Sequence, residues 1–244
     1  MKIIAYSYRY ADAVLNDAAF SATYKELIDK LEALEPSLYV PEKVKIRKRE
    51  KLVRAFPVDQ KAMNSALEKS MPAGWAIRPL VVDRNDGPMT KIRSDFKKDR
   101  IQVEVQFGNM ARWYTDVFKF QLAYSLGDID VGILVVPTNR FANLIDENVA
   151  SYERVLRELP WAKMSLTLPI LVVGIEPSDY SAVKERYEEG GRNYADKAAT
   201  DYQRLLEQGD AKVAEKKRPK ALRPFAEALA EEGDVEGELD EADE

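Results

Sequence analysis

The chain has 244 residues, of which 45% are hydrophobic and 32% charged, and these values are typical of one globular domain with a buried core. Its net charge of −5 argues at first against a nucleic-acid partner. It contains neither cysteine nor histidine, which excludes disulfides, thiolate zinc sites and histidine-based triads and leaves hydrolytic chemistry to carboxylates with a hard metal ion, or to Lys, Tyr or Ser.

The N-terminal part of the chain is expected to be mainly helical. Its first residues lack the apolar core of a signal peptide, and no apolar run reaches the roughly 18 residues of a membrane helix, so we expect a cytoplasmic protein without membrane contact. Apolar side chains at helical spacing predict helices over 11–35, ended by Pro36, and over 60–70. The basic stretch 43–54 between them is either a solvated surface or an arm that contacts phosphates.

The central part of the chain has the clearest signals of secondary structure. Residues 101–107 alternate strictly between apolar and polar, which predicts a strand with Glu104 and Gln106 on one face. The complete pattern predicts, in order, a strand over 101–107, a helix over 109–126, a strand over 129–136, a helix over 146–159 and a strand over 168–175. This order predicts an α/β core in which crossover helices join parallel strands.

The C-terminal part is polar, and its charges are segregated. A basic cluster over 212–223 precedes nine acidic residues, with no basic ones, over 231–244. Removing those nine negative charges changes the net charge from −5 to +4, so the body of the chain is mildly basic and compatible with DNA binding. We expect a single domain over 1–230 and a disordered acidic tail over 231–244.

Three polar residues in and before the central strand could carry chemistry: Asp95, Glu104 and Gln106. Asp95 precedes Glu104 by nine residues, a gap that suits a strand and a turn, so a hairpin would bring the two carboxylates together. With the backbone carbonyl of Val105 they would form a magnesium site, whose bound water can become a nucleophile. This spacing also arises by chance in acidic chains, and a solvated strand face is the alternative.

The same residues carry a resemblance to a known family. Residues 94–109, SDFKKDRIQVEVQFGN, resemble the active-site segment of the BglII/BstYI group of type II restriction endonucleases. This group belongs to the PD-(D/E)XK nuclease superfamily and has glutamine where most members have the motif lysine. Further similar stretches extend the resemblance over most of residues 1–177: 10–16, 56–58, 74–75, 129–132 and 168–177. The resemblance implies a restriction-endonuclease-like fold, a central mixed β-sheet flanked by helices.

The resemblance also implies roles for the candidate residues. Asp95 and Glu104, with the carbonyl of Val105, would bind Mg²⁺, and Glu104 would orient the attacking water. Gln106 would position water or phosphate by hydrogen bonds, and because an amide cannot act as a general base, the proton would leave through solvent or the substrate phosphate. A fourth active-site residue is left open. The family has an amide at the place of Arg78, and Asn64 and Glu68 are the other candidates.

Recognition of DNA is expected from residues that follow the central strand. Asn109 matches a family position that reads bases in the major groove, and it also suits the N-cap of the following helix. Arg140, Asn143 and Asn148 lie in the loop 138–148, where the family reads sequence. They would contact bases, Arg140 preferring guanine, or they are exposed loop residues.

The activity implied by the resemblance is Mg²⁺-dependent cleavage of both strands of a short palindromic double-stranded DNA site. A GATC-centred site, 5′-phosphate ends and a cognate DNA methyltransferase follow from the family pattern. The enzyme would be a homodimer, because a two-fold protein matches a two-fold site. Tyr114 and Phe118 would pack against the second subunit or, alternatively, in the core. Other possibilities are a repair or modification-dependent nuclease on the same fold, and a non-enzymatic DNA-binding protein with a decayed site.

Overall fold

The computed structural model describes residues 1–38, 57–81, 92–146, 148–163, 165–187 and 189. The chain divides into two compact units, one made of 1–38 with 56–178 and one made of 39–55 with 179–244. Every strand and helix named below belongs to the first unit, and the described part of the second is helical over 180–187. The expected basic stretch 43–54, the basic cluster 212–223 and the acidic tail 231–244 lie outside the described residues.

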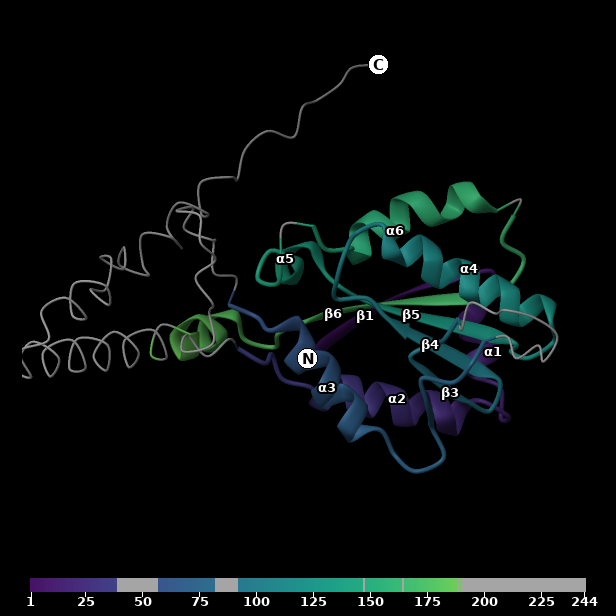
Figure 1. Cartoon of the computed structure of the whole chain (residues 1–244), viewed down its shortest axis with the longest axis horizontal. Helices are drawn as coiled ribbons and strands as arrows, with labels where there is room; N and C mark the ends of the chain where they lie inside the picture. Colours follow the sequence, from purple (N-terminus) through teal and green to yellow (C-terminus); the bar gives the residue numbers. More distant parts are fainter. Residues whose placement is uncertain (39–56, 82–91, 147, 164, 188, 190–244) are drawn as a thin grey trace, which may run out of the picture. The chain divides into compact units, whose positions relative to one another are not determined.

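A six-stranded mixed sheet forms the centre of the first unit (Figure 1). Its strands, in spatial order, are β1 (Lys2–Tyr8), β6 (Ile170–Glu176), β5 (Val131–Pro137), β4 (Ile101–Val105), β3 (Phe96–Lys98) and β2 (Ala76–Ile77). The three central strands, β6, β5 and β4, are parallel, whereas β1, β3 and β2 run antiparallel to their neighbours. The predicted mixed sheet with a parallel core is therefore confirmed.

Helices cover both faces of this sheet (Figure 1). One face carries α4 (Arg112–Ser125) and α6 (Tyr152–Glu158), which a 3₁₀ helix extends over Leu159–Ala162. The other face carries α2 (Ser21–Ala33) and α3 (Gln60–Ser70). Two short helices complete the unit, α1 (Ala11–Leu15) and α5 (Asn139–Ala142). No helix among the described residues is both long and apolar enough to cross a membrane.

The bounds of several elements differ from the sequence-based prediction. The helix expected over 11–35 is two helices, because a turn at Asp17 interrupts it: the Asp17 carboxylate accepts a hydrogen bond from Ala19 N at 2.9 Å, and its carbonyl accepts from Phe20 N and Ser21 N. Strand β1 was not predicted. The helix expected over 146–159 begins at Tyr152.

The core between the sheet and α4 fixes where that helix lies. Trp113, Val117 and Phe120 are buried there, as the apolar stripe of 109–126 predicted. A Cβ built at Gly132 on β5 would lie 2.8 Å from the Phe120 ring, so the helix approaches the sheet as closely as a glycine allows. Each of these large side chains contributes about 1.5–3 kcal/mol by burial. The helix is thereby held on β5, beside the strand β4 that carries the site residues.

Candidate active site

A tight hairpin between β3 and β4 brings the two candidate acids together. Phe96 pairs with Val103, and Lys98 with Ile101, across a turn whose two residues have positive φ. Continued by one residue, this register places Asp95 opposite Glu104, and opposite residues of an antiparallel pair share one face. The Asp95 Oδ2 atom accepts a hydrogen bond of 2.8 Å from Val105 N. The predicted hairpin is confirmed.

Burial dominates the electrostatics of both carboxyl groups. Burial raises the pKa of Glu104 to about 8; Lys119 opposes this shift, and the negative charges of Asp116 and Asp95 add to it. Burial likewise raises the pKa of Asp95, against the hydrogen bond from Val105 N. That Asp95 acts on the pKa of Glu104 agrees with the two groups being neighbours. A nearby divalent cation would favour the ionised form of both groups.

The Glu104 side chain is completely buried, in a hydrogen-bonded network beneath α4. Its Oε2 atom lies 2.7 Å from Lys119 Nζ, and its Oε1 atom accepts from Gln102 Nε2 at 2.9 Å. Lys119 Nζ also lies 2.8 Å from Asp116 Oδ1. Glu104 is thus not on a solvated strand face, which was the alternative explanation of its spacing.

The amide of Gln106 joins the same network from the strand side. Its Nε2 atom donates to Asp116 Oδ2 at 2.9 Å, and its Oε1 atom accepts from Gly108 N at 3.0 Å. The expected role of Gln106 in positioning water or phosphate stays a prediction. Asp116 and Lys119 were not predicted as site residues. The available signal was weak: an acid and a base three residues apart on the predicted helix.

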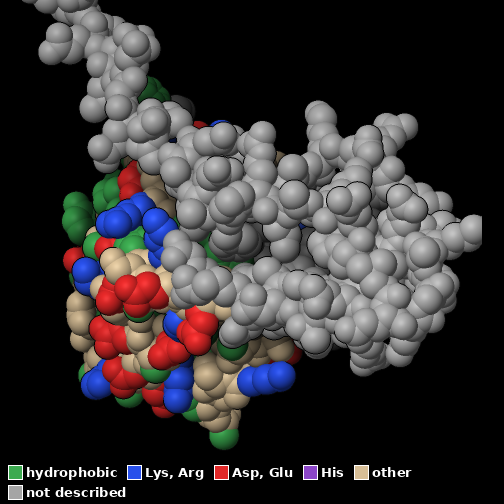
Figure 2. Space-filling model, turned by 90° about the vertical axis from the view of Figure 1, so that its left-hand side faces the viewer, with side chains coloured by type: hydrophobic (Ala, Val, Ile, Leu, Met, Phe, Trp, Pro, Cys, Tyr) green, Lys and Arg blue, Asp and Glu red, His purple; other side chains and the backbone are tan. Residues whose placement is uncertain are grey.

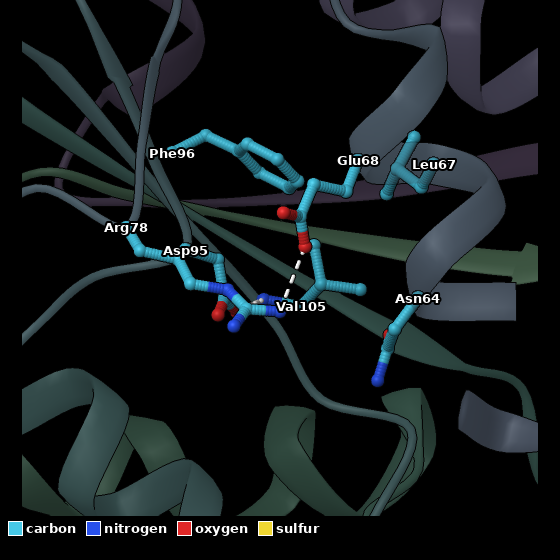
Figure 3. Close-up of a pocket in the computed structure, with 7 residues that line it drawn as sticks. All are labelled: Asn64, Leu67, Glu68, Arg78, Asp95, Phe96 and Val105. Atoms are coloured by element: carbon cyan, nitrogen blue, oxygen red, sulfur yellow. Dashed lines mark hydrogen bonds and ion pairs between the residues drawn. The ribbon is translucent and has the colours of Figure 1, made fainter. Parts of the chain in front are cut away.

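All three candidates for the fourth active-site residue lie beside Asp95 in one pocket (Figure 3). Asn64 and Glu68 reach it from α3, and Arg78 reaches it from the chain after β2. The Arg78 guanidinium lies 2.8 Å from Glu68 Oε2, and its backbone N–H donates to Asp95 O at 2.8 Å. Its φ of 52° is in the left-handed region, so the pairing with Asp95 holds this backbone in an uncommon conformation.

The donor set fits a hard divalent cation that is bound by few protein ligands. Asp95 and Glu104 offer two hard carboxylate donors, and the described residues contain no group of three or more Asp, Glu, His or Cys side chains placed to hold a metal ion. Magnesium is typically bound through one or two carboxylates and keeps several waters. Asp95, Glu104 and Asp116 also interact electrostatically with one another and with the ammonium of Lys119, and three carboxyl groups near one ammonium favour a divalent cation.

The residues expected to contact DNA form two groups. Asn109 and Asn148 are brought together, because Asn109 forms a β-bridge with Val149 and Met110 N donates to Asn148 O at 2.8 Å. Asn109 Oδ1 accepts from Ala111 N at 2.8 Å, but the N-cap of α4 is Ala111, so the expectation that Asn109 is the N-cap is wrong. Arg140 lies on α5, and Asn143 is its C-cap. Contact with bases stays a prediction for all four.

Part of the expected recognition loop 138–148 is the short helix α5, begun by a hydrogen bond from Phe141 N to the Thr138 hydroxyl. On the face drawn in Figure 2, acidic and basic side chains lie interspersed over the described part of the surface.

The α4 side chains Tyr114 and Phe118 are 48% and 59% exposed, so the alternative that they pack in the core is wrong.

Comparisons with known proteins agree with this architecture. A family model described as restriction endonuclease BglII/BglIII matches residues 3–175. A crystal structure of the restriction endonuclease BglII complexed with a DNA 16-mer is similar, with 19% identity over 74% of this chain and 78% of that chain and a TM-score of 0.57. A structure of free BglII shows 21% identity over 74% and 82%, with a TM-score of 0.52.

A comparison with curated proteins found no match. The two structural likenesses establish the fold, and the family model covers well over half of the sequence. The chain therefore belongs to the BglII/BglIII family of restriction endonucleases and is a type II site-specific deoxyribonuclease.

Proposed function

We propose that this enzyme uses Mg²⁺ to hydrolyse phosphodiester bonds in both strands of a short palindromic DNA site, leaving 5′-phosphates. The observation that carries this proposal is the β3–β4 hairpin, whose register sets Asp95 opposite Glu104 and whose buried environment raises the pKa of both. Glu104 is buried and Asp95 partly buried, and once ionised they place two negative charges on one face of the sheet that a divalent cation would neutralise. Membership of the family supports the reaction class.

The residues of the hairpin would divide the work. Asp95, Glu104 and the carbonyl of Val105 would hold Mg²⁺, which supplies a more acidic bound water and stabilises negative charge on the phosphate. Asp95 is kept in place by Val105 N, and Glu104 by its two side-chain partners. Gln106 can orient a water or a phosphate oxygen through its amide. It cannot accept a proton, so the proton leaves through solvent or the substrate phosphate.

Recognition is assigned to the segments that follow β4 and β5. We infer that Asn109 with Asn148, and Arg140 with Asn143, contact base edges of a GATC-centred site, because amide and guanidinium groups pair with purines in the major groove. One similar structure is described as a complex with a DNA 16-mer, which supports DNA as the substrate class.

We further infer that the enzyme acts as a homodimer in the cytoplasm, with a cognate methyltransferase that protects host DNA. Two exposed aromatic side chains one turn apart on α4, Tyr114 and Phe118, support an interface on this helix. A palindromic site has the two-fold symmetry of such a dimer. The nuclease domain over 1–230 with a disordered tail over 231–244 also stays part of the proposal.

Digestion of phage DNA with the purified protein, followed by sequencing of the fragment ends, tests the proposal. Discrete bands with Mg²⁺, absent with EDTA and abolished in Asp95→Asn and Glu104→Gln, are expected. The common sequence at the ends gives the site. Cleavage of methylated DNA alone would favour a modification-dependent nuclease. Binding without cleavage at any Mg²⁺ concentration would favour a decayed site and overturn the proposal.

A further inference from the structure

One charged side chain in the site contacts a proposed metal ligand but neither binds the metal nor takes part in the chemical step. Lys119, in the middle of α4, is only 15% exposed, and its ammonium contacts two buried carboxyl groups: Glu104 Oε2 at 2.7 Å and Asp116 Oδ1 at 2.8 Å. Taking an ammonium out of water is costly unless opposite charges compensate it. Accordingly the pKa of Lys119 is raised: burial alone would lower it, but the charges of Glu104 and Asp116 outweigh burial.

The surroundings hold this ammonium at the metal-binding edge of the hairpin. The helix that carries Lys119 is fixed by Phe120, whose ring packs against the backbone at Gly132. The second carboxylate, Asp116, is itself held by Gln106 Nε2 at 2.9 Å. Lys119 also lowers the pKa of Asp95, although less than burial raises it, so its charge is felt by both of the proposed metal ligands.

We propose that Lys119 is an internal counter-ion of the metal site: in the metal-free protein its ammonium holds the Glu104 carboxylate in position, and a divalent cation competes with it for that carboxylate. Lys119 is thus a positioning residue. The inference rests on the proposed function, because it takes Asp95 and Glu104 as the metal ligands. A purely structural ion pair would stabilise the fold equally with and without a divalent cation.

The two possibilities predict different responses to removal of the charge. Lys119→Met leaves Glu104 and Asp116 without their cation, so the metal-free protein loses thermal stability. If Lys119 competes with the metal, the variant also binds divalent cations more tightly. Without the ammonium, Glu104 also binds a proton more tightly, and this proton competes with the metal and reduces the gain in metal affinity. An ammonium repels a divalent ion about twice as strongly as it repels a proton, so a net gain in metal affinity remains.

The experiment measures Mg²⁺ and Ca²⁺ affinity by calorimetry, and Tm with and without each ion, at pH 8.5 and above. For Lys119→Met we expect an affinity higher by about tenfold or more and a larger metal-induced rise in Tm than in the unsubstituted enzyme. Lys119→Arg keeps the charge and should stay near the parent. Lys98→Met is the matched control, because Lys98 is 19% exposed and pairs with Glu26 at 2.6 Å at the far end of the hairpin. It should lower Tm without changing metal affinity.

Unchanged or weaker metal binding in Lys119→Met, with normal binding by the parent, overturns the inference about Lys119 alone. Absence of metal binding in the parent overturns the proposed metal site and this inference with it. If Lys119→Met does not fold, the comparison of the parent with Lys119→Met is replaced by a comparison of Asp116→Asn with Asp116→Asn/Lys119→Met. The double variant removes one carboxylate together with the ammonium. The double variant must then bind metal more tightly than Asp116→Asn, and an equal or lower affinity refutes the competition.

Discussion

The raised pKa of Glu104 makes divalent-cation binding depend steeply on pH. In the metal-free protein, burial raises the pKa of this carboxyl group to about 8, so below that pH the group is mostly protonated and competes less well for a metal ion. Metal binding must then release the proton. We expect the affinity for Mg²⁺ to rise with pH up to about 8 and to level off above it.

The size of the effect follows from the fraction of Glu104 that is ionised. With a pKa of about 8, roughly 1% is ionised at pH 6 and about half at pH 8, which gives an affinity change of about fiftyfold, or about 2.3 kcal/mol. The raised pKa of Asp95 acts in the same direction and steepens the dependence at the acidic end.

Calorimetric titration with Mg²⁺ in two buffers of different protonation enthalpy gives both the affinity and the number of protons released. Release approaching one proton is expected at pH 6.5 and little release at pH 9. Glu104→Gln should bind weakly at all pH values and release no proton from this position. A parent affinity that stays constant between pH 6 and 8, without proton release, would falsify the assignment of Glu104 as a buried ligand with a raised pKa.

The folding of the metal-free protein provides an independent readout of the same proton. The folded-state pKa of Glu104, about 8, lies above the value of 4.5 for an exposed group, so the folded chain binds more protons between these two values. Its contribution to the free energy of unfolding is therefore highest below pH 4.5 and decreases as the pH rises towards 8, by up to about 1.4 kcal/mol per pH unit. Urea denaturation at several pH values, with Glu104→Gln for comparison, measures this slope.

Three further substitutions test other parts of the structure. Arg78→Gln should reduce the slope of log affinity for DNA against log salt concentration by about 0.9 for each phosphate that the arginine neutralises. Arg100→Gln is the control and should leave this slope unchanged, because Arg100 is also at positive φ in an exposed ion pair but lies at the opposite end of β4. Equal slopes for the two variants would mean that Arg78 contacts no phosphate. Phe118→Glu should leave stability nearly unchanged and shift sedimentation from dimer to monomer, and a persistent dimer would place the interface elsewhere. Gly132→Ala should cost about 1–3 kcal/mol in urea denaturation, since its Cβ would meet the buried Phe120 ring at 2.8 Å, and a neutral result would mean that the ring can move.

Local patterns in the sequence were sufficient for the hairpin that carries the acids. The alternation over 101–107 predicts which side chains share a face, and the nine-residue gap from Asp95 to Glu104 is a short-range relation. Strand β1 was missed because its pairing with β6, for example Ile4 with Gly174, joins distant parts of the chain. The break in the first helix depends on hydrogen bonds to the side chain and carbonyl of one residue, Asp17, that the spacing of apolar residues does not report.

The charged pair on α4 was missed for a different physical reason. Helical periodicity assigns charged residues to the solvent side, yet Asp116 is buried and the Lys119 side chain is only 15% exposed. Their burial is possible only because Glu104 and Gln106 on the facing strand supply partners. Each half of this network is unfavourable without the other half, so neither the strand nor the helix predicts it when it is considered alone.

The glutamine at position 106 makes sense together with this lysine. Gln106 Nε2 and Lys119 Nζ bind the two different oxygens of Asp116, one as a neutral donor and one as a cation. A lysine at position 106 would place a second positive charge on the same carboxylate. That charge would cancel more of the negative excess shared by Asp95, Glu104 and Asp116, and it would weaken the attraction for a divalent ion. A neutral amide on the strand and a cation on the helix thus satisfy both oxygens of Asp116 while leaving more negative charge for a divalent ion.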